Sequence, residues 1–172
     1  MKIFLIGLPG SGKSTLGKQL ANALHLPFID LDSEIEKECE SPIAEIFKIE
    51  GEAWFREKEA QVLRDRTKEY QTFVMATGGG APCFYEGIDF MNQIGVTIFL
   101  DVPVAVITDR IIKEGKETRP LLAREDAEVD SVISKLYTQR LACYSKAMHR
   151  VRDSNISVNT LLDLIRASRI KS

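Results

Sequence analysis

The chain has few of the residues that several large classes of protein need. Only three cysteines and two histidines occur in 172 residues, and Cys39, Cys83 and Cys143 form no C-x-x-C pair. Neither a disulfide framework nor a zinc site is implied, and two histidines exclude a histidine-rich metal centre. We therefore expect the cysteines to be small buried hydrophobes.

The chain also lacks a strong excess of charge and a long apolar run. Its formal net charge is -2, which argues against nonspecific nucleic-acid binding because neutralising phosphates requires clustered Lys and Arg. The N-terminal apolar stretch is too short for a signal peptide. With 44% hydrophobic and 28% charged residues, the composition is that of a soluble globule. We expect a single domain over 1–172, cytoplasmic and monomeric, with a small-molecule partner and no membrane partner.

The most informative feature that is present follows the apolar run Ile3 to Ile6. The sequence G-L-P-G-S-G-K-S-T from Gly7 to Thr15 matches the phosphate-binding loop G-x-x-x-x-G-K-[ST] in its required position after a strand. Such a loop turns backbone N–H groups and a helix N-terminus toward a triphosphate. An ordinary glycine-rich turn is the weaker interpretation. The expected ATP-binding residues here are Gly10, Ser11, Gly12, Lys13, Ser14 and Thr15, with the Ser14 hydroxyl able to ligate Mg²⁺.

Short β-type runs alternate with longer helical patterns along the chain, which is typical of a parallel sheet covered by helices on both faces. We predict a five-stranded α/β fold with strands at 2–7, 27–30, 72–77, 96–101 and 155–158. Helices are predicted over 12–25, after the Ser41-Pro42 pair with Ser41 as N-cap, and over 52–69 following a break at Gly51.

Two carboxylates follow the second predicted strand. Asp30 and Asp32 lie two residues apart, so in an extended chain they point the same way, at the edge where α/β sheets bind ligands. One could hold Mg²⁺ and the other could accept a proton from a hydroxyl. Alternatively, Asp32 caps a helix that begins near Ser33.

Three consecutive glycines, Gly78, Gly79 and Gly80, follow the third predicted strand. Glycine loses more backbone entropy on folding than any other residue, so a run of three needs a reason. We predict that something approaches this backbone closely, and favour a ligand over a plain flexible turn.

Three arginines stand in informative places. Arg140 falls within an apolar helical stripe that runs from Val129 to Tyr144, where its charge needs an anionic partner, either a ligand or an internal salt bridge. Arg56 lies beside the apolar face of the helix after Gly51. Arg119 lies in a charged segment with Gly and Pro, which we expect to form a mobile lid over about 113–123.

These motifs, in this order, resemble those of the shikimate kinase family over nearly the whole chain. They are the phosphate loop, D-L-D from Asp30, G-E-x-x-F-R ending at Arg56, A-T-G-G-G-A from Ala76, R-P-L from Arg119, and Arg140 four residues before Tyr144. The chain departs from the family in having Ala142 where a proline is usual, and in lacking a clear late arginine near Ser154 to Ser157.

The resemblance implies a nucleoside-monophosphate-kinase-like P-loop fold and ATP-dependent phosphorylation of the 3-hydroxyl of shikimate. It implies that Asp32 is the base, that Arg56, Gly79 and Arg140 hold the acceptor, that Arg119 acts from the lid with Lys13, and that Arg110 lies near adenine. Ser14 and Asp30 would serve Mg²⁺. A kinase for another acid such as gluconate, a GTP-driven switch and a non-catalytic nucleotide-binding module are the alternatives, and the switch is disfavoured because no N-K-x-D motif occurs.

Overall fold

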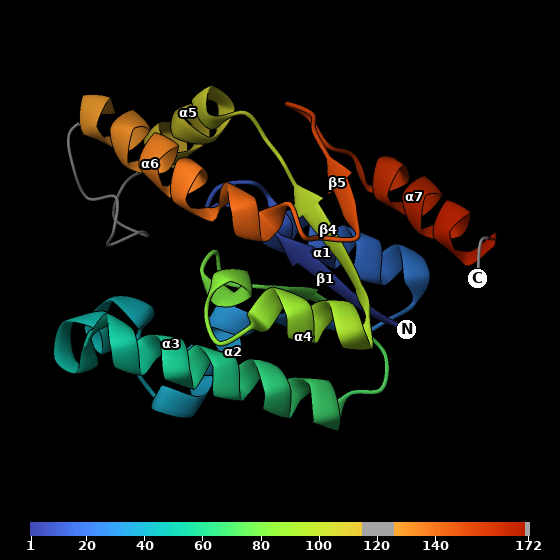
Figure 1. Cartoon of the computed structure of the whole chain (residues 1–172), viewed down its shortest axis with the longest axis horizontal. Helices are drawn as coiled ribbons and strands as arrows, with labels where there is room; N and C mark the ends of the chain where they lie inside the picture. The colour runs from blue at the N-terminus through green and yellow to red at the C-terminus, as the bar shows by residue number, and fades with distance from the viewer. Residues whose placement is uncertain (115–125, 171–172) are drawn as a thin grey trace.

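The computed structural model describes residues 1–114 and 126–170, and in this part of the chain five strands form one sheet (Figure 1). Every neighbouring pair is parallel, in the order β2-β3-β1-β4-β5, which confirms the predicted α/β class. The strands are β1 (Lys2–Ile6), β2 (Phe28–Asp30), β3 (Phe73–Ala76), β4 (Val96–Leu100) and β5 (His149–Val151).

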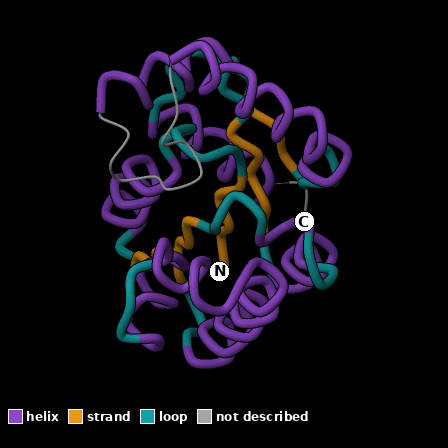
Figure 2. The backbone as a smooth tube through the Cα atoms, turned by 90° about the vertical axis from the view of Figure 1, so that its left-hand side faces the viewer, coloured by secondary structure: helices purple, strands orange, loops and turns teal. Residues whose placement is uncertain are grey.

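Helices cover both faces of this sheet, as Figure 2 shows by the strands enclosed between helical segments. Helix α1 packs on β1, β2 and β3 and against α7, whereas α4 packs on β4. Strand β3 is buried at every position, as expected for a strand covered on both faces. The helices are α1 (Lys13–Leu24), α2 (Leu31–Cys39), α3 (Ile43–Glu69), α4 (Gly87–Ile94), α5 (Val104–Glu114), α6 (Asp126–Tyr144) and α7 (Val158–Ile170), with a 3-10 turn η1 (Ala81–Cys83) before α4.

Helix α3 contains the break that the sequence predicts at Gly51. Its φ of 82° and ψ of 171° are non-helical and belong to a region that is essentially restricted to glycine, so two helical segments meet there at an angle. The predicted N-cap is wrong by one residue. Pro42, with an extended ψ of 146°, occupies the cap position, while the Ser41 hydroxyl donates a hydrogen bond to Glu45.

The fifth strand exists, but the prediction placed it wrongly at 155–158. Strand β5 begins at His149. Its middle residue, Arg150, is exposed, so the strand lacks an apolar run in the sequence. Arg150 forms an ion pair of 2.7 Å with the buried Asp101. The predicted segment instead leads into α7. Its Ser157 Oγ accepts a hydrogen bond from the backbone N–H of Thr160, which is a helix-capping arrangement.

In the sequence, the predicted lid over 113–123 falls between α5 and α6. Only residues 113 and 114 of this segment are among the described residues, and Arg119 lies outside them. Within 1–114 and 126–170, no helix combines the length and the apolar character needed to cross a bilayer.

Candidate active site

The carboxyl ends of the central strands open into a cavity of about 940 Å³. This is the edge at which parallel α/β sheets bind ligands. The phosphate loop and the start of α1 line one part of the cavity, and residues from α2, the glycine run and α6 line another. Among the predicted site residues, those that line it are Gly10, Ser11, Gly12, Lys13, Ser14, Thr15, Asp30, Asp32, Gly79, Arg110 and Arg140.

The phosphate loop has the backbone that its glycines allow. Gly10 and Gly12 have φ of 82° and 90°, values that side-chain-bearing residues rarely adopt, and α1 begins at the next residue, Lys13. The Lys13 ammonium donates to the carbonyl oxygens of Gly7 at 3.0 Å and Leu8 at 2.8 Å. The Ser11 hydroxyl is buried and has no hydrogen-bond partner in the described part of the chain. The loop therefore offers helix N–H groups, a cation and a free hydroxyl at one end of the cavity.

Asp30 lies where β2 ends and links the phosphate loop to α2. Its Oδ2 accepts a hydrogen bond of 2.6 Å from the Ser14 hydroxyl, and its Oδ1 accepts one of 3.4 Å from the backbone N–H of Ser33. Asp30 is thus the N-cap of α2. Because carboxylate and hydroxyl oxygens are hard ligands, the Ser14 and Asp30 pair fits Mg²⁺.

Asp32 does not lie in an extended chain, as the sequence analysis assumed, because α2 begins at Leu31. The alternative in which Asp32 caps the helix is also wrong, since Asp30 takes that position. The helical turn nevertheless leaves both carboxylates lining one cavity. Burial raises the pKa of Asp32, and the negative charge of Asp30 raises that pKa further.

The prediction that something approaches the backbone of the glycine run closely is confirmed, but the groups observed there are side chains of the protein itself, whereas the prediction favoured a ligand. The position that a Cβ on Gly79 would take lies 3.0 Å from Arg140 Nη1 and 3.0 Å from Pro9. A Cβ on Gly78 would collide with the Glu59 carboxylate, and one on Gly80 would collide with the Arg56 guanidinium. Each absent side chain therefore leaves space for a charged group of the protein itself.

Three predicted site residues, Arg56, Gly78 and Gly80, are not among the residues that line the cavity. Arg56 lies directly against Gly80. The Arg56 side chain is buried, with Nη1 donating to Glu59 Oε2 at 2.8 Å and Nη2 lying 3.2 Å from Glu52 Oε1. Its guanidinium lies 4.7 Å from the centre of the Phe84 ring. Ion pairs and an aromatic contact thus fix this guanidinium against the glycine backbone.

Glu59, which lies against Gly78 and Arg56, is a buried charged residue that the sequence analysis missed. It is 1% exposed, its Oε1 has no hydrogen-bond partner among the described residues, and burial raises the pKa of its carboxyl to about 7 although Arg56 opposes this. The available signal was its helical spacing, three residues after Arg56 and three before the buried Val62.

Arg140 on α6 lines the cavity, which confirms its place on the inward stripe. Within the part of the chain that the structure describes, no carboxylate lies within 4.0 Å of its guanidinium, so the internal salt bridge is not observed there. One helical turn later, the buried Tyr144 donates a hydrogen bond of 2.5 Å to the Gly79 carbonyl. Helix α6 is thereby fixed to the glycine run.

Arg110 bridges the outer part of the cavity. Its guanidinium donates to the carbonyl of Gly10 at 3.4 Å and to that of Ser154 at 3.0 Å. Residues 155–158, which also line the cavity, carry no charge and were not recognised from the sequence as site residues.

Comparison with known proteins agrees with this geometry. The family model described as shikimate kinase matches residues 9–167. A shikimate kinase of Bacteroides fragilis is 43% identical over 148 residues, which are 86% of this chain and 82% of the relative. The chain belongs to the shikimate kinase family.

Solved structures of family members have the same fold. The crystal structure of shikimate kinase from Bacteroides thetaiotaomicron superposes with a TM-score of 0.90 at 38% identity, covering 96% of this chain and 98% of that one. Shikimate kinase from Acinetobacter baumannii, solved in complex with shikimate, gives a TM-score of 0.87 at 32% identity, covering 99% and 93%. The nucleotide-kinase type of P-loop fold is thus confirmed for this member of the shikimate kinase family.

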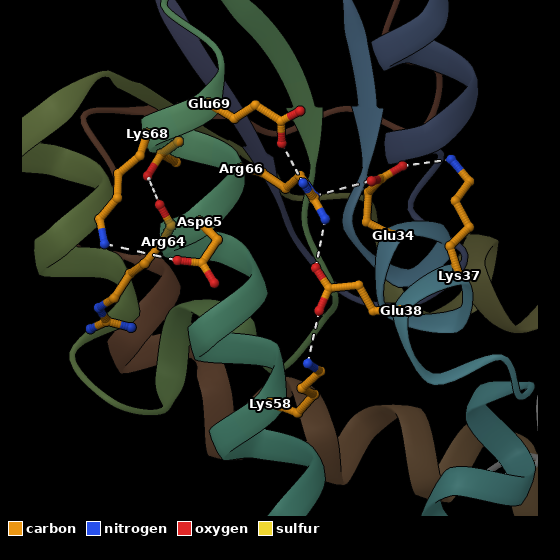
Figure 3. A network of polar contacts seen from close by, with 10 residues as sticks. Glu34, Lys37, Glu38, Lys58, Arg64, Asp65, Arg66, Lys68 and Glu69 are labelled. Carbon is orange, nitrogen blue, oxygen red and sulfur yellow. Dashed lines mark hydrogen bonds and ion pairs between the residues drawn. The ribbon is translucent and has the colours of Figure 1, made fainter.

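A surface ion-pair network holds the two helices that carry the acidic and basic site residues together (Figure 3). Arg66 of α3 pairs with Glu34 at 3.1 Å and Glu38 at 2.6 Å on α2, and Lys58 pairs with Glu38 at 2.8 Å. Arg66 also pairs with Glu69 within its own helix. Networked pairs with partly buried partners constrain geometry more than isolated surface pairs do. The network fixes α2, with Asp32, relative to α3, with Arg56 and Glu59.

The raised pKa of Glu59 predicts how the stability of the ligand-free protein changes with pH. Because its pKa rises from 4.5 to about 7 in the folded protein, the protonated carboxyl is favoured by folding, and its contribution is full below pH 4.5 and lost as the pH rises through about 7. Glu59→Gln should remove this loss, so the variant should gain stability relative to wild type between about pH 5 and 7.5. Urea unfolding across that range measures it.

Glu57→Gln, an exposed neighbour on the same helix, is the control and should follow the wild-type profile. Parallel profiles for Glu59→Gln and wild type would show that the Glu59 carboxyl stays ionised in the folded protein.

Proposed function

We propose that this protein transfers the γ-phosphoryl group of ATP to the 3-hydroxyl of shikimate, giving shikimate 3-phosphate and ADP, in the chorismate branch of aromatic amino acid biosynthesis. The observation that carries the proposal is one cavity that is lined by the phosphate loop, by the carboxylate of Asp32 and by the guanidinium of Arg140. Membership in the shikimate kinase family supports the same acceptor.

The nucleotide end would bind ATP through the phosphate loop. Backbone N–H groups from Gly10 to Thr15 surround the phosphates, Lys13 adds a positive charge, and Arg110 lies toward the base. Ser14 and Asp30 would hold Mg²⁺, which when bound neutralises charge on the outer phosphates. The Ser14–Asp30 hydrogen bond shows that the two oxygens already converge.

The acceptor end would bind an acid that carries a hydroxyl. Arg140, with Gly79 beside it, offers a guanidinium for the carboxylate, and Arg56 completes the pair from behind the glycine backbone. Asp32 orients the reacting hydroxyl and accepts its proton. A raised pKa makes the Asp32 carboxylate a stronger base than an ordinary one.

Most of the rate would come from positioning and charge neutralisation, because phosphoryl transfer passes through a loose transition state. We assign Arg119, within the predicted lid over 113–123, to the developing phosphoryl charge on the basis of the family motif. We also propose that the protein acts as a cytoplasmic monomer on small molecules, without nucleic-acid or membrane partners.

An assay coupled to ADP release tests the acceptor. Shikimate, quinate, gluconate and nucleoside monophosphates are compared at saturating ATP, and shikimate should give the highest kcat/KM. A higher kcat/KM with gluconate or a nucleoside monophosphate would contradict the proposed acceptor while preserving the kinase assignment.

Asp32→Asn should lower kcat by roughly 10²–10⁴, the range for loss of a positioned general base, because an amide cannot accept the hydroxyl proton. The ATP dissociation constant should change little, since Asp32 is not part of the phosphate loop. Steady-state kinetics and nucleotide titration measure the two quantities. Asp163→Asn, on the exposed face of α7, is the control, and an unchanged kcat in Asp32→Asn would exclude the base role.

Arg140→Ala should raise the shikimate KM by roughly 10-fold or more, the loss expected for a charge-assisted hydrogen bond, and leave the ATP KM nearly unchanged. Arg140→Lys should restore binding only partly, because an ammonium lacks the planar two-pronged geometry. Steady-state kinetics with each substrate varied provide the test, with Arg166→Ala on α7 as the exposed control. Equal increases in both KM values would make Arg140 a structural residue.

A further inference from the structure

Two of the three cysteines meet where η1 packs against α6. Cys83 is the last residue of η1, Cys143 lies 60 positions later in α6, and each thiol is the neighbour that most strongly affects the other. The two elements contact one another, and both cysteines pack against the core while remaining only partly buried. The expectation that these cysteines are simply buried hydrophobes is therefore incomplete, because the fold creates a thiol pair with partial access to solvent.

This pair lies beside the acceptor end of the site. Cys83 follows Gly80 by three residues, and Cys143 follows Arg140 by three residues on the same helix. Between them, the Tyr144 hydroxyl donates its hydrogen bond to the Gly79 carbonyl. Any change in the separation of η1 and α6 therefore acts on the backbone and the guanidinium that we assign to the acceptor.

The two thiols differ in a way that suits stepwise oxidation. Interaction with the Cys143 thiol lowers the pKa of the Cys83 thiol, and the charges of Arg140 and Arg56 lower it further, against the opposing effect of burial. Interaction with the Cys83 thiol and burial raise the pKa of Cys143. Cys83 is thus the attacking thiolate and Cys143 the resolving thiol.

We propose that Cys83 and Cys143 are an oxidation site, which low-molecular-weight disulfides convert to an intramolecular disulfide, and that this bond weakens acceptor binding. The Cys83 thiolate attacks the reagent disulfide and releases one thiolate, and the Cys143 thiol then loses its proton and displaces the second. Two protein thiols lose two electrons in total, and one reagent disulfide becomes two thiols. The effect on the acceptor, though not the oxidation itself, rests on the proposed function.

The expected consequence follows from bond length. A disulfide holds its sulfur atoms about 2.05 Å apart, closer than any hydrogen-bonded pair of thiols. Closing this gap moves η1 toward α6, and with them the glycine run and Arg140. The phosphate loop joins β1 to α1 and approaches the glycine run through Pro9, whereas Lys13 and Ser14 belong to α1, so nucleotide binding should change less than acceptor binding.

The test is oxidation of the full-length protein with glutathione disulfide, followed by alkylation, intact mass and kinetics. Two of the three thiols should be lost without a retained glutathione, and the shikimate KM should rise by about 3-fold or more, reversibly with dithiothreitol, while the ATP KM stays within about twofold. Cys83→Ser and Cys143→Ser should each abolish the KM response to oxidation, whereas Cys39→Ser should retain it.

A stable glutathione adduct on a single cysteine, three surviving thiols, or a Cys83–Cys143 bond with an unchanged shikimate KM would each overturn the proposal. If the reduced protein does not phosphorylate shikimate, the proposed function fails instead, and the mass measurement still reports on the thiol chemistry.

Discussion

The site depends on close packing of charged side chains against a backbone that has no side chains of its own. At Gly78 and Gly80 the space that a Cβ would fill is taken by Glu59 and Arg56, and at Gly79 a Cβ would lie 3.0 Å from Arg140 and from Pro9. These groups come from α3 and α6, each of which contacts η1 directly after the glycine run. The constraint is one of space, since a Cβ at each position meets a charged group of the protein.

The same packing sets the electrostatics of the acceptor end. Burial beside the glycine run raises the pKa of Asp32 and of Glu59, while the fixed Arg56 guanidinium offsets part of the cost of keeping a carboxylate there. The ion-pair network between α2 and α3 keeps these opposite charges in register. Positive φ occurs in the phosphate loop, at Gly51 and at four residues without glycine's freedom, which are His25, Glu40, Tyr85 and Glu86. Gly78, Gly79 and Gly80 are not among these positions, and the acceptor end relies on packed charge.

The parts of the fold that local pattern determines were predictable. The phosphate loop and four of the five strands follow from apolar runs and glycine spacing, whereas β5 was missed because its middle residue, Arg150, is exposed. Arg140 was recognisable as a charge on an apolar stripe. Glu59 and the Cys83–Cys143 pair were not, because their partners come from distant segments and only tertiary packing brings those segments together. The start of α2 at Leu31 was not predicted because Asp30 and Asp32 are both aspartates, and the sequence does not show which of them caps the helix.

A double-mutant cycle between Gly79→Ala and Arg140→Ala tests the central claim most directly. The new methyl group would lie 3.0 Å from Arg140 Nη1, so Gly79→Ala alone should raise the shikimate KM by displacing that guanidinium. In the Arg140→Ala background it should raise the KM little further, and the two penalties should be strongly non-additive. If they simply add, Gly79 acts independently of Arg140, and the idea that the bare backbone exists to admit these charges is contradicted.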